Sequence, residues 1–308
     1  MRPLVAVNGR LSSPEEAVVP ALDRGFLYGD SVYEVLWWHR GVLVQAGEHF
    51  ARLRESGRRI YLDVPEGDAR WHAAIDPVVA ACGCGHDEDV YVRLVVTRGV
   101  GPLGLPVGEG LVPTVVVYVA PAHRPTEAER RQGLSALCVD RLRNDARALD
   151  PGAKTGNYMN NLLALHEARA RGGDDALLFN AAGELTEATT SNVYLVTRGA
   201  LVTPPLAAGI LEGTTRRRIL SLCRAAAIPV AERTVRPADL PQADEIFLSS
   251  SVRGVVAVSR LDGRPVGSGT RGPVTERIHR LFEAAADAEA VAAASGPHGS
   301  ADRGFGVG

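Results

Sequence analysis

The stretch "KTGNYMNNLLALHEAR", residues 154–169, begins with the only lysine in a chain of 308 residues, and the other 33 cationic side chains are arginines. Arginine keeps its charge and binds carboxylates and phosphates, whereas a lysine amine can lose its proton near neutral pH and act as a nucleophile. Two interpretations follow: a chance lysine on a solvated face, or an amine that the chemistry requires. Pro151 and Gly152 precede Lys154, and the apolar residues Leu162, Leu163 and Leu165 predict a helix after it. Lys154 is therefore expected at a strand–loop–helix junction, which favours the second interpretation.

The bulk composition bounds the possible functions. A chain of 308 residues, 45% hydrophobic and 23% charged, has room for two modest domains. Its net charge of -2 predicts no basic surface that would bind nucleic acid. It has no apolar run long enough to span a membrane, and "MRPLVAVNGRL" (1–11) does not resemble a secretion signal. Four scattered cysteines predict no disulfide framework, and "CGCGH" (82–86) lacks the second ligand pair of a metal site. We therefore expect a cytoplasmic protein without a metal, a membrane or a nucleic acid partner.

The apolar pattern predicts an α+β protein, because strands outnumber helices without a strict βαβ alternation. A small α/β domain is expected over residues 1–120, a polar linker with two prolines over 121–132, a larger domain over 133–288 and a disordered tail over 289–308. The expected strands are 4–9, 31–38, 41–45, 89–97, 113–119, 134–139, 175–180, 192–197, 200–204 and 245–251. The expected helices are 47–60, 69–82, 158–171, 214–227 and 273–288.

Further stretches place polar side chains at a turn, at a helix start and at a strand end. In "GELTEATTSNVYLV" (183–196), Glu187 either caps a turn or faces a pyridine nitrogen, where a carboxylate keeps the ring protonated as an electron sink. In "GILEGTTRRRIL" (209–220), Gly213, Thr214 and Thr215 open a helix, which is either an ordinary N-terminus or a phosphate site. "FLSSSVRG" (247–254) ends a strand in Ser249, Ser250 and Ser251, a second place for donors to an oxyanion. Arg52 is expected on the inner side of an early helix.

From "VNGRL" to "GPVTERI" the chain resembles the class IV (fold-type IV) pyridoxal-phosphate enzymes, which include branched-chain and D-amino-acid aminotransferases, (R)-amine transaminases and aminodeoxychorismate lyases. The motifs that carry the resemblance are "DRGFLYGDSVYEV", "HFARL", "KTGNYMNNLLA", "GELTEATTSNVYLV", "GILEGTTR" and "DEIFLSSS". The resemblance implies a small N-terminal domain, a larger β-barrel-like domain and bound pyridoxal 5'-phosphate. It implies the following cofactor contacts: Lys154 as the Schiff-base lysine, Glu187 at the ring nitrogen, Tyr158 at the ring hydroxyl, Leu211 on the ring face, and Arg52, Thr214, Thr215, Ser250 and Ser251 around the phosphate.

The substrate side is where the chain departs from its relatives. The resemblance implies that Tyr91 binds the α-carboxylate and Arg93 a second carboxylate, with Tyr33 and Val252 completing the pocket. Trp37 stands where branched-chain enzymes usually carry another arginine, and we expect it to face the pocket on the same strand face as Tyr33. "TRGVGPLGL" (97–105) lacks the arginine of D-amino-acid aminotransferases.

These features favour a ping-pong transaminase that moves an amino group between an amino acid, of L configuration and with a hydrophobic or aromatic side chain, and a 2-oxo acid. The alternatives are an aminodeoxychorismate-type lyase, which Gly254 in place of a glutamate favours, and a D-amino-acid or amine transaminase. A non-catalytic carrier of the cofactor and a nucleotide-binding protein using "GVGPLG" (99–104) are hypotheses from other classes. Members of this family complete their pocket from a second subunit, so the resemblance implies a homodimer or a larger homo-oligomer.

Overall fold

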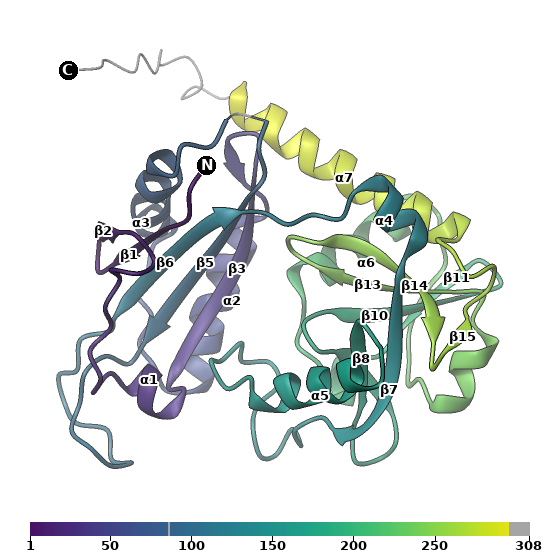
Figure 1. Ribbon diagram of the computed structural model, residues 1–308, viewed down its shortest axis with the longest axis horizontal. Coiled ribbons are helices and arrows are strands. Elements are labelled where there is room, and N and C mark those ends of the chain that lie inside the picture. Colours follow the sequence, from purple (N-terminus) through teal and green to yellow (C-terminus); the bar gives the residue numbers. More distant parts are fainter. Residues whose placement is uncertain (86, 296–308) are drawn as a thin grey trace.

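The computed structural model describes residues 1–85 and 87–295, so His86 and residues 296–308 lie outside the described part. Two sheets lie side by side, each with helices packed against it, and a long C-terminal helix crosses both (Figure 1). This arrangement confirms the predicted α+β class. No helix in the described ranges is both long and apolar enough to cross a membrane.

The first sheet has six strands in the order β2-β1-β6-β5-β3-β4, with antiparallel neighbours throughout. The strands are β1 (Leu4–Val7), β2 (Arg10–Ser12), β3 (Ser31–His39), β4 (Val42–Leu43), β5 (Val90–Thr97) and β6 (Val115–Pro121). The helices are α1 (Arg24–Tyr28), α2 (Ala46–Arg59) and α3 (Asp68–Ala81).

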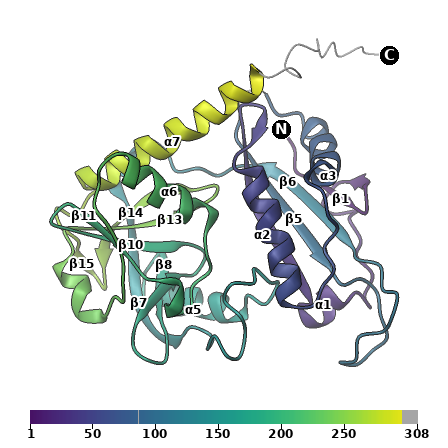
Figure 2. The ribbon, with the colours of Figure 1, turned by 180° about the vertical axis from the view of Figure 1, so that it is seen from behind.

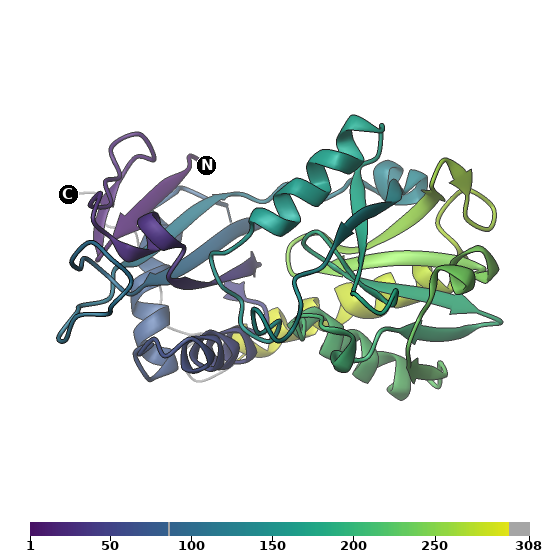
Figure 3. The ribbon, with the colours of Figure 1, turned by 90° about the horizontal axis from the view of Figure 1, so that it is seen from below.

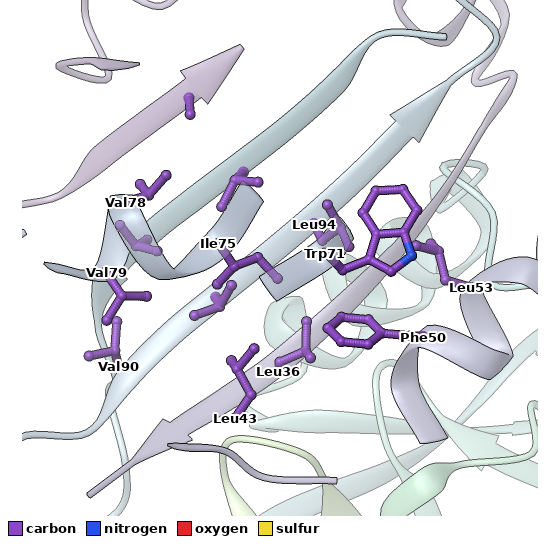
Figure 4. Close-up of a cluster of buried hydrophobic side chains, with 14 of the residues drawn as sticks. Leu36, Leu43, Phe50, Leu53, Trp71, Ile75, Val78, Val79, Val90 and Leu94 are labelled. Carbon is purple, nitrogen blue, oxygen red and sulfur yellow. The ribbon is translucent and has the colours of Figure 1, made fainter. Parts of the chain in front are cut away.

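One face of this sheet is covered by α2 and α3 (Figure 2). Along β5 the residues alternate, so Val90, Val92, Leu94 and Val96 point into the core while their neighbours point the other way. Phe50 and Leu53 on α2 and Trp71 and Ile75 on α3 fill the space above them, and all four side chains are fully buried (Figure 4).

The opposite face of the sheet carries a polar and aromatic row. Val35 on β3 pairs with Arg93 on β5, and Arg93 pairs in turn with Tyr118 on β6. One step along, Trp37 pairs with Tyr91. Because side chains alternate along each strand, these residues share one face with Tyr33, and that face looks toward the second sheet (Figure 3).

The second sheet follows the order β12-β11-β10-β13-β14-β7-β8-β9, with β15 beside β14. Strand β9 at one end also contacts β10 near the other end, so the sheet curls into a half-barrel. Its strands are β7 (Leu134–Leu142), β8 (Asp175–Phe179), β9 (Leu185–Ala188), β10 (Asn192–Thr197), β11 (Ala200–Thr203), β12 (Val230–Glu232), β13 (Glu245–Ser250), β14 (Gly254–Leu261) and β15 (Arg264–Pro265). Helix α5 (Met159–Ala170) packs on β7 and β8, whereas α6 (Thr214–Ala225) and α7 (Pro273–Ala294) cover β13 and β14. Two short 3₁₀ turns, η1 (Leu206–Ala208) and η2 (Pro237–Gln242), complete this half.

The structure adds a helix within the expected linker and lengthens the last predicted helix. The expected linker 121–132 contains helix α4 (Glu127–Gln132), which Thr126 begins by accepting a hydrogen bond from the Glu129 N–H while Glu129 accepts one from the Thr126 N–H. The last helix does not end at 288 but runs to Ala294, because Ala290 is buried and Glu289 binds the first domain. The rest of the expected tail lies outside the described residues.

Candidate active site

A cavity of about 750 Å³ lies between the two sheets. Its walls come from β3, β5 and β6 on one side and from β9, α6 and the turn after β13 on the other. Thirteen of the fourteen predicted site residues line it: Tyr33, Arg52, Tyr91, Arg93, Lys154, Tyr158, Glu187, Leu211, Thr214, Thr215, Ser250, Ser251 and Val252. The motifs that the sequence spreads over some 220 residues thus face one space.

Lys154 reaches the cavity from a segment that pairs with the edge of β3. The Tyr33 N–H donates to the Lys154 carbonyl at 3.0 Å, the Lys154 N–H donates to Ser56 Oγ on α2 at 3.0 Å, and Gly156 N–H donates to the Ser31 carbonyl at 2.9 Å. The backbone at Lys154 is therefore held by β3 and by α2 of the first domain. Its Nζ lies 3.2 Å from the Tyr158 hydroxyl and 4.4 Å from the centre of the Tyr33 ring.

The two tyrosines beside the lysine differ in their electrostatics. Burial raises the pKa of Tyr33 far above its ordinary value. Burial acts in the same direction on Tyr158, but the neighbouring Lys154 charge and its hydrogen bonds lower the pKa of Tyr158 overall. The Tyr158 hydroxyl is therefore the one that can share a proton with the lysine amine.

Glu187 is a buried carboxylate held at both oxygens. Arg143 Nε donates to Oε1 at 3.0 Å, Arg143 Nη2 lies 2.9 Å from the same oxygen, and the Leu211 N–H donates to Oε2 at 3.1 Å. Burial outweighs these donors and raises the pKa of Glu187 above its ordinary value. Burial thus disfavours the ionised carboxylate in the ligand-free chain, and a protonated pyridine nitrogen is the kind of cationic partner that favours it. Arg143 belongs to the polar segment 140–150, which carries no pattern that predicts its role.

The N-terminus of α6 is buried without a side-chain cap. Thr214 and Thr215 are 1% and 3% exposed, and Gly213 at the N-cap gives the helix no capping side chain. A Cβ on Gly213 would clash with the Asn192 side chain, so the backbone comes closer there than another residue allows. Free N–H groups at a helix start attract an anion, and Arg52 and Ser251 line the same cavity. The donor set fits a phosphate monoester.

The cationic side chains of the cavity have different partners. Arg52 binds Glu34, Arg143 binds Glu187, Arg253 binds Asp175, and Lys154 bonds to Tyr158. Arg93 has no carboxylate partner among the described residues, and its guanidinium lies 4.0 Å from the centre of the Tyr33 ring. The cavity thus holds one arginine whose charge no carboxylate of the described chain neutralises.

Trp37 is the predicted site residue that the structure places elsewhere. It lies on the expected strand face, but it is 1% exposed and packs with Phe282 of α7, with ring centres 6.2 Å apart. Its Nε1 donates to Asp89 at 2.7 Å, and Arg124 lies 3.8 Å from its ring centre. The expectation that Trp37 faces the substrate is therefore wrong, because the α7 end of β3 is covered by core and only the Tyr33 end opens to the cavity.

Two more buried groups next to the site were not predicted. Glu34 is bonded to Arg52 and His49, and His49 is bonded to Thr214; the side chains of Glu34 and His49 are 0% and 2% exposed.

Among the residues that the structure describes, no group of three or more His, Cys, Asp or Glu side chains is arranged to hold a metal ion.

The fold and the cavity fit an enzyme of the pyridoxal-phosphate type, because an amine, a buried carboxylate and the N-terminus of a helix surround one space. Residues 31–261 match the model of the family "Amino-transferase class IV", and the chain belongs to that family. Class IV aminotransferases use pyridoxal 5'-phosphate, so this is a fold-type IV pyridoxal-phosphate-dependent aminotransferase.

Similar proteins fall into two substrate groups. The chain is 34% identical over 279 residues to a D-alanine aminotransferase of Bacillus licheniformis, covering 91% of this chain and 95% of that protein. It is 33% identical over 279 residues to a putative branched-chain-amino-acid aminotransferase of Methanocaldococcus jannaschii, with the same shares covered. It also resembles the crystal structure of the branched-chain aminotransferase of the archaeon Thermoproteus uzoniensis with norvaline, with a TM-score of 0.84 and 32% identity over 93% of this chain and 95% of that one.

Proposed function

We propose that this aminotransferase transfers the amino group of an L-amino acid with a hydrophobic or aromatic side chain to a 2-oxo acid, with Lys154 as the residue that carries the cofactor. The observation that carries the proposal is the Arg93 guanidinium, which has no carboxylate partner among the described residues and shares the cavity with the Lys154 amine. A cation without a described carboxylate partner, close to a nucleophilic amine, suits the second carboxylate of a dicarboxylic 2-oxo acid acceptor.

The bound cofactor supplies the electron sink that makes the substrate's α-proton acidic. Lys154 Nζ moves that proton, and the Tyr158 hydroxyl at 3.2 Å orients the amine and shares its hydrogen bond. Glu187, held by Arg143 and the Leu211 N–H, keeps a proton at the ring nitrogen. Arg52, Thr214, Thr215 and Ser251 hold the phosphate, and Leu211 lies against the ring. The support for these roles is that all of these residues line the same cavity.

The pocket composition supports the choice of substrate. Tyr33, Val35, Tyr91 and Tyr118 give the first-domain wall an aromatic and apolar character, and the Tyr91 and Tyr118 rings lie edge to face with centres 6.2 Å apart. Such a wall favours side chains of leucine or phenylalanine size over short ones.

The experiment is a donor screen on the purified holoenzyme. Each enantiomer of leucine, phenylalanine, alanine and glutamate is added without acceptor, and the conversion of the cofactor absorbance to that of its amino form is followed. We expect the L-enantiomers of leucine and phenylalanine to react fastest. Pyruvate release from aminodeoxychorismate, with no reaction of any amino acid, would overturn the proposal in favour of a lyase.

A second candidate is a D-amino-acid transaminase, which the 34% identity to a D-alanine aminotransferase favours. Reaction of the D-enantiomers alone in the same screen would establish it, and would leave Lys154 and Glu187 in the same roles.

We further propose that the enzyme is a homodimer. Phe26 on α1 and Leu103 and Leu105 in the loop between β5 and β6 are 74%, 73% and 80% exposed. Leu162 on α5 is 56% exposed and also lines the cavity, so apolar surface reaches its mouth. A second copy of the chain is the partner that we expect to cover this apolar surface.

The four free cysteines support a reducing, cytoplasmic location.

A further inference from the structure

Glu34 on β3 is a fully buried carboxylate beside the proposed phosphate seat. Its Oε1 accepts from Arg52 Nε at 2.7 Å, and its Oε2 accepts from Arg52 Nη2 at 2.6 Å and from His49 Nδ1 at 2.7 Å. The side chain is 0% exposed. Burial opposes its ionisation, but Arg52 and His49 lower the pKa of Glu34 to about 2. Glu34 is therefore an ionised carboxylate that accepts three hydrogen bonds from Arg52 and His49.

This ion pair fixes the Arg52 guanidinium before any ligand binds. A guanidinium has five N–H donors, and three are used: two on Glu34 and one on the Glu212 carbonyl, which Nη1 reaches at 3.1 Å. Glu212 precedes the N-cap Gly213, so Arg52 is attached to the start of α6 as well as to β3. Two N–H donors remain for the cavity that Arg52 lines.

The same carboxylate sets the direction of the next hydrogen bond. An ionised carboxylate only accepts, so His49 Nδ1 carries the proton that Glu34 accepts. Burial lowers the pKa of His49 in spite of the attraction of Glu34, so the ring is neutral and its Nε2 is an acceptor. The Thr214 hydroxyl lies 3.2 Å from that Nε2 and must donate to it. The hydroxyl proton of Thr214 is thus committed to His49.

We propose that Glu34 and His49 are positioning residues of the phosphate seat: they lock Arg52 and turn the Thr214 hydroxyl away from the phosphate. The phosphate is then held by Arg52, the Thr215 hydroxyl and the N–H groups that open α6, and Thr214 contributes its backbone but no hydroxyl donor. This inference rests on the proposed phosphate seat and deepens it.

The test compares two ligands of the apoenzyme that differ only in the phosphate. The dissociation constants of pyridoxal 5'-phosphate and of pyridoxal are measured for each variant, and their ratio reports the seat alone. A variant that only destabilises the fold weakens the binding of both ligands alike, so the ratio of their dissociation constants stays unchanged. The ³¹P resonance of the bound phosphate is recorded as a second readout.

Glu34→Gln removes the charge that holds Arg52 in place, and its amide N–H₂ group faces the N–H donors of Arg52 and His49. We expect the preference for the phosphorylated ligand to fall about ten- to a hundredfold, the loss of one charge-assisted contact. Glu55→Gln, a carboxylate of α2 that binds Arg58 and Arg59 on the surface, is the matched control and should leave the ratio unchanged.

Two threonine variants test the hydroxyl assignment. Thr215→Val should lower the ratio at least tenfold, whereas Thr214→Val should change it less than threefold, whatever its effect on stability. If Glu34→Gln does not fold, His49→Asn answers the question, because its amide can still donate to Glu34 while Thr214 is released. It should shift the ³¹P resonance and leave the ratio no lower than in the wild type.

The outcomes separate the two levels of the proposal. An unchanged ratio in both Arg52→Ala and Thr215→Val would overturn the phosphate seat itself. A fall in those two variants with no change in Glu34→Gln, or an unshifted ³¹P resonance in His49→Asn, would overturn the positioning role. An equal fall in Thr214→Val and Thr215→Val would overturn the hydroxyl assignment.

Discussion

Lys154 illustrates how one side chain is prepared for chemistry by its backbone. The strand edge of β3 and the Ser56 hydroxyl hold the main chain on both sides of the lysine, so its side chain projects toward Tyr158 and Tyr33 rather than into solvent. A guanidinium at the same position keeps the charge but offers no nucleophilic amine. That difference is a sufficient physical reason for a lysine in a chain that otherwise uses arginine.

Lys154→Arg should therefore fold and bind phosphate-bearing ligands yet show no turnover, below about one per cent of the wild-type rate. Borohydride reduction of the wild-type holoenzyme should attach the cofactor to the peptide that contains Lys154, as peptide mass spectrometry would show. Since the chain has no second lysine, turnover of several per cent in the variant would remove Lys154 from its proposed role.

Arg93→Ala should impair dicarboxylate substrates more than apolar ones. Arg93 is the cavity arginine without a described carboxylate partner, so the second carboxylate of 2-oxoglutarate loses one charge-assisted contact, worth about 1.5–3 kcal/mol. We expect KM for 2-oxoglutarate to rise ten- to a hundredfold, and KM for 4-methyl-2-oxopentanoate to rise less than threefold. Equal losses for both acceptors would show that Arg93 binds the carboxylate that all 2-oxo acids share.

Glu34 should make stability depend on acid pH. Its pKa is about 2 in the folded chain and near its ordinary value, about 4.3, when unfolded, so its contribution is complete above about pH 5 and is lost as the pH falls toward 2. This difference between the folded and unfolded pKa corresponds to about 3 kcal/mol in the free energy of unfolding. Urea unfolding of the apoenzyme at pH 6, 4 and 3 should therefore show a steeper loss in the wild type than in Glu34→Gln. The exposed control Glu66→Gln should follow the wild-type curve, and parallel curves for all three proteins would contradict the assignment.

Local patterns singled out only part of the cavity wall: a lone lysine, the helix start at Thr214 and Thr215, and a strand end rich in serine. Other cavity residues, such as Tyr91, Arg93 and Leu211, were predicted from the resemblance to class IV enzymes and had no local signal of their own. Trp37 misled the prediction because alternation fixes a strand face but not what covers each end of it, and α7 covers this one. Glu34 and His49 gave no signal, since a carboxylate in a strand and a histidine in a helix are ordinary until the fold brings Arg52 and Thr214 to them.

At the scale of elements, α7 joins the two halves. Its first turns pack on β13 and β14, whereas its last turns reach β3 and β4. The sequence predicted an end at 288 because the following alanines carry little apolar weight, but Ala290 is 4% exposed and Glu289 bonds to the Gln45 N–H at 2.8 Å and to Arg218 at 2.8 Å. Tertiary contacts of this kind have no local pattern, whereas the capping residues Thr126 and Glu129 of α4 are a local pattern that the linker prediction missed.

Glu289→Ala should destabilise the junction of α7 with α2. Gln45 is the N-cap of α2, with a left-handed φ of 54° and no side-chain cap of its own, so the variant leaves its nearly buried N–H without an acceptor. We expect a loss of about 1–3 kcal/mol in the free energy of unfolding. Asp287→Ala is the control from the same helix, because that half-exposed carboxylate binds His39 and Arg40 and should cost less than about 1 kcal/mol. Equal costs in the two variants would argue against a special role for Glu289.

At the scale of the whole molecule, the elements that carry the exposed side chains of Phe26, Leu103, Leu105 and Leu162 are attached to one another. Arg24 on α1 donates to the carbonyls of Gly104 and Leu105, and the Gly104 N–H donates to the Tyr28 hydroxyl, so the loop between β5 and β6 is attached to α1. Asn157, just before α5, donates to the Gly29 carbonyl at the other end of α1. Loop, α1 and α5 are therefore held together on the side of the molecule away from α7 (Figure 1), next to the mouth of the cavity.

A homodimer through this surface predicts that its apolar side chains control the association. Stable interfaces bury about 1,600 Å², and a few large apolar residues near their centre contribute most of the free energy, about 2 kcal/mol or more each. Light scattering after gel filtration should give twice the mass of the chain for the wild type, and Leu105→Glu or Phe26→Glu should raise the dissociation constant at least tenfold. Val291→Glu on α7, which is 64% exposed but lies on the opposite side, is the matched control and should stay dimeric. Because Leu162 belongs both to the exposed surface and to the cavity wall, dissociation should also lower turnover, and activity should return as the variant is concentrated. A wild-type monomer with full activity at every concentration would show that the cavity is complete within one chain and that another partner covers the apolar surface.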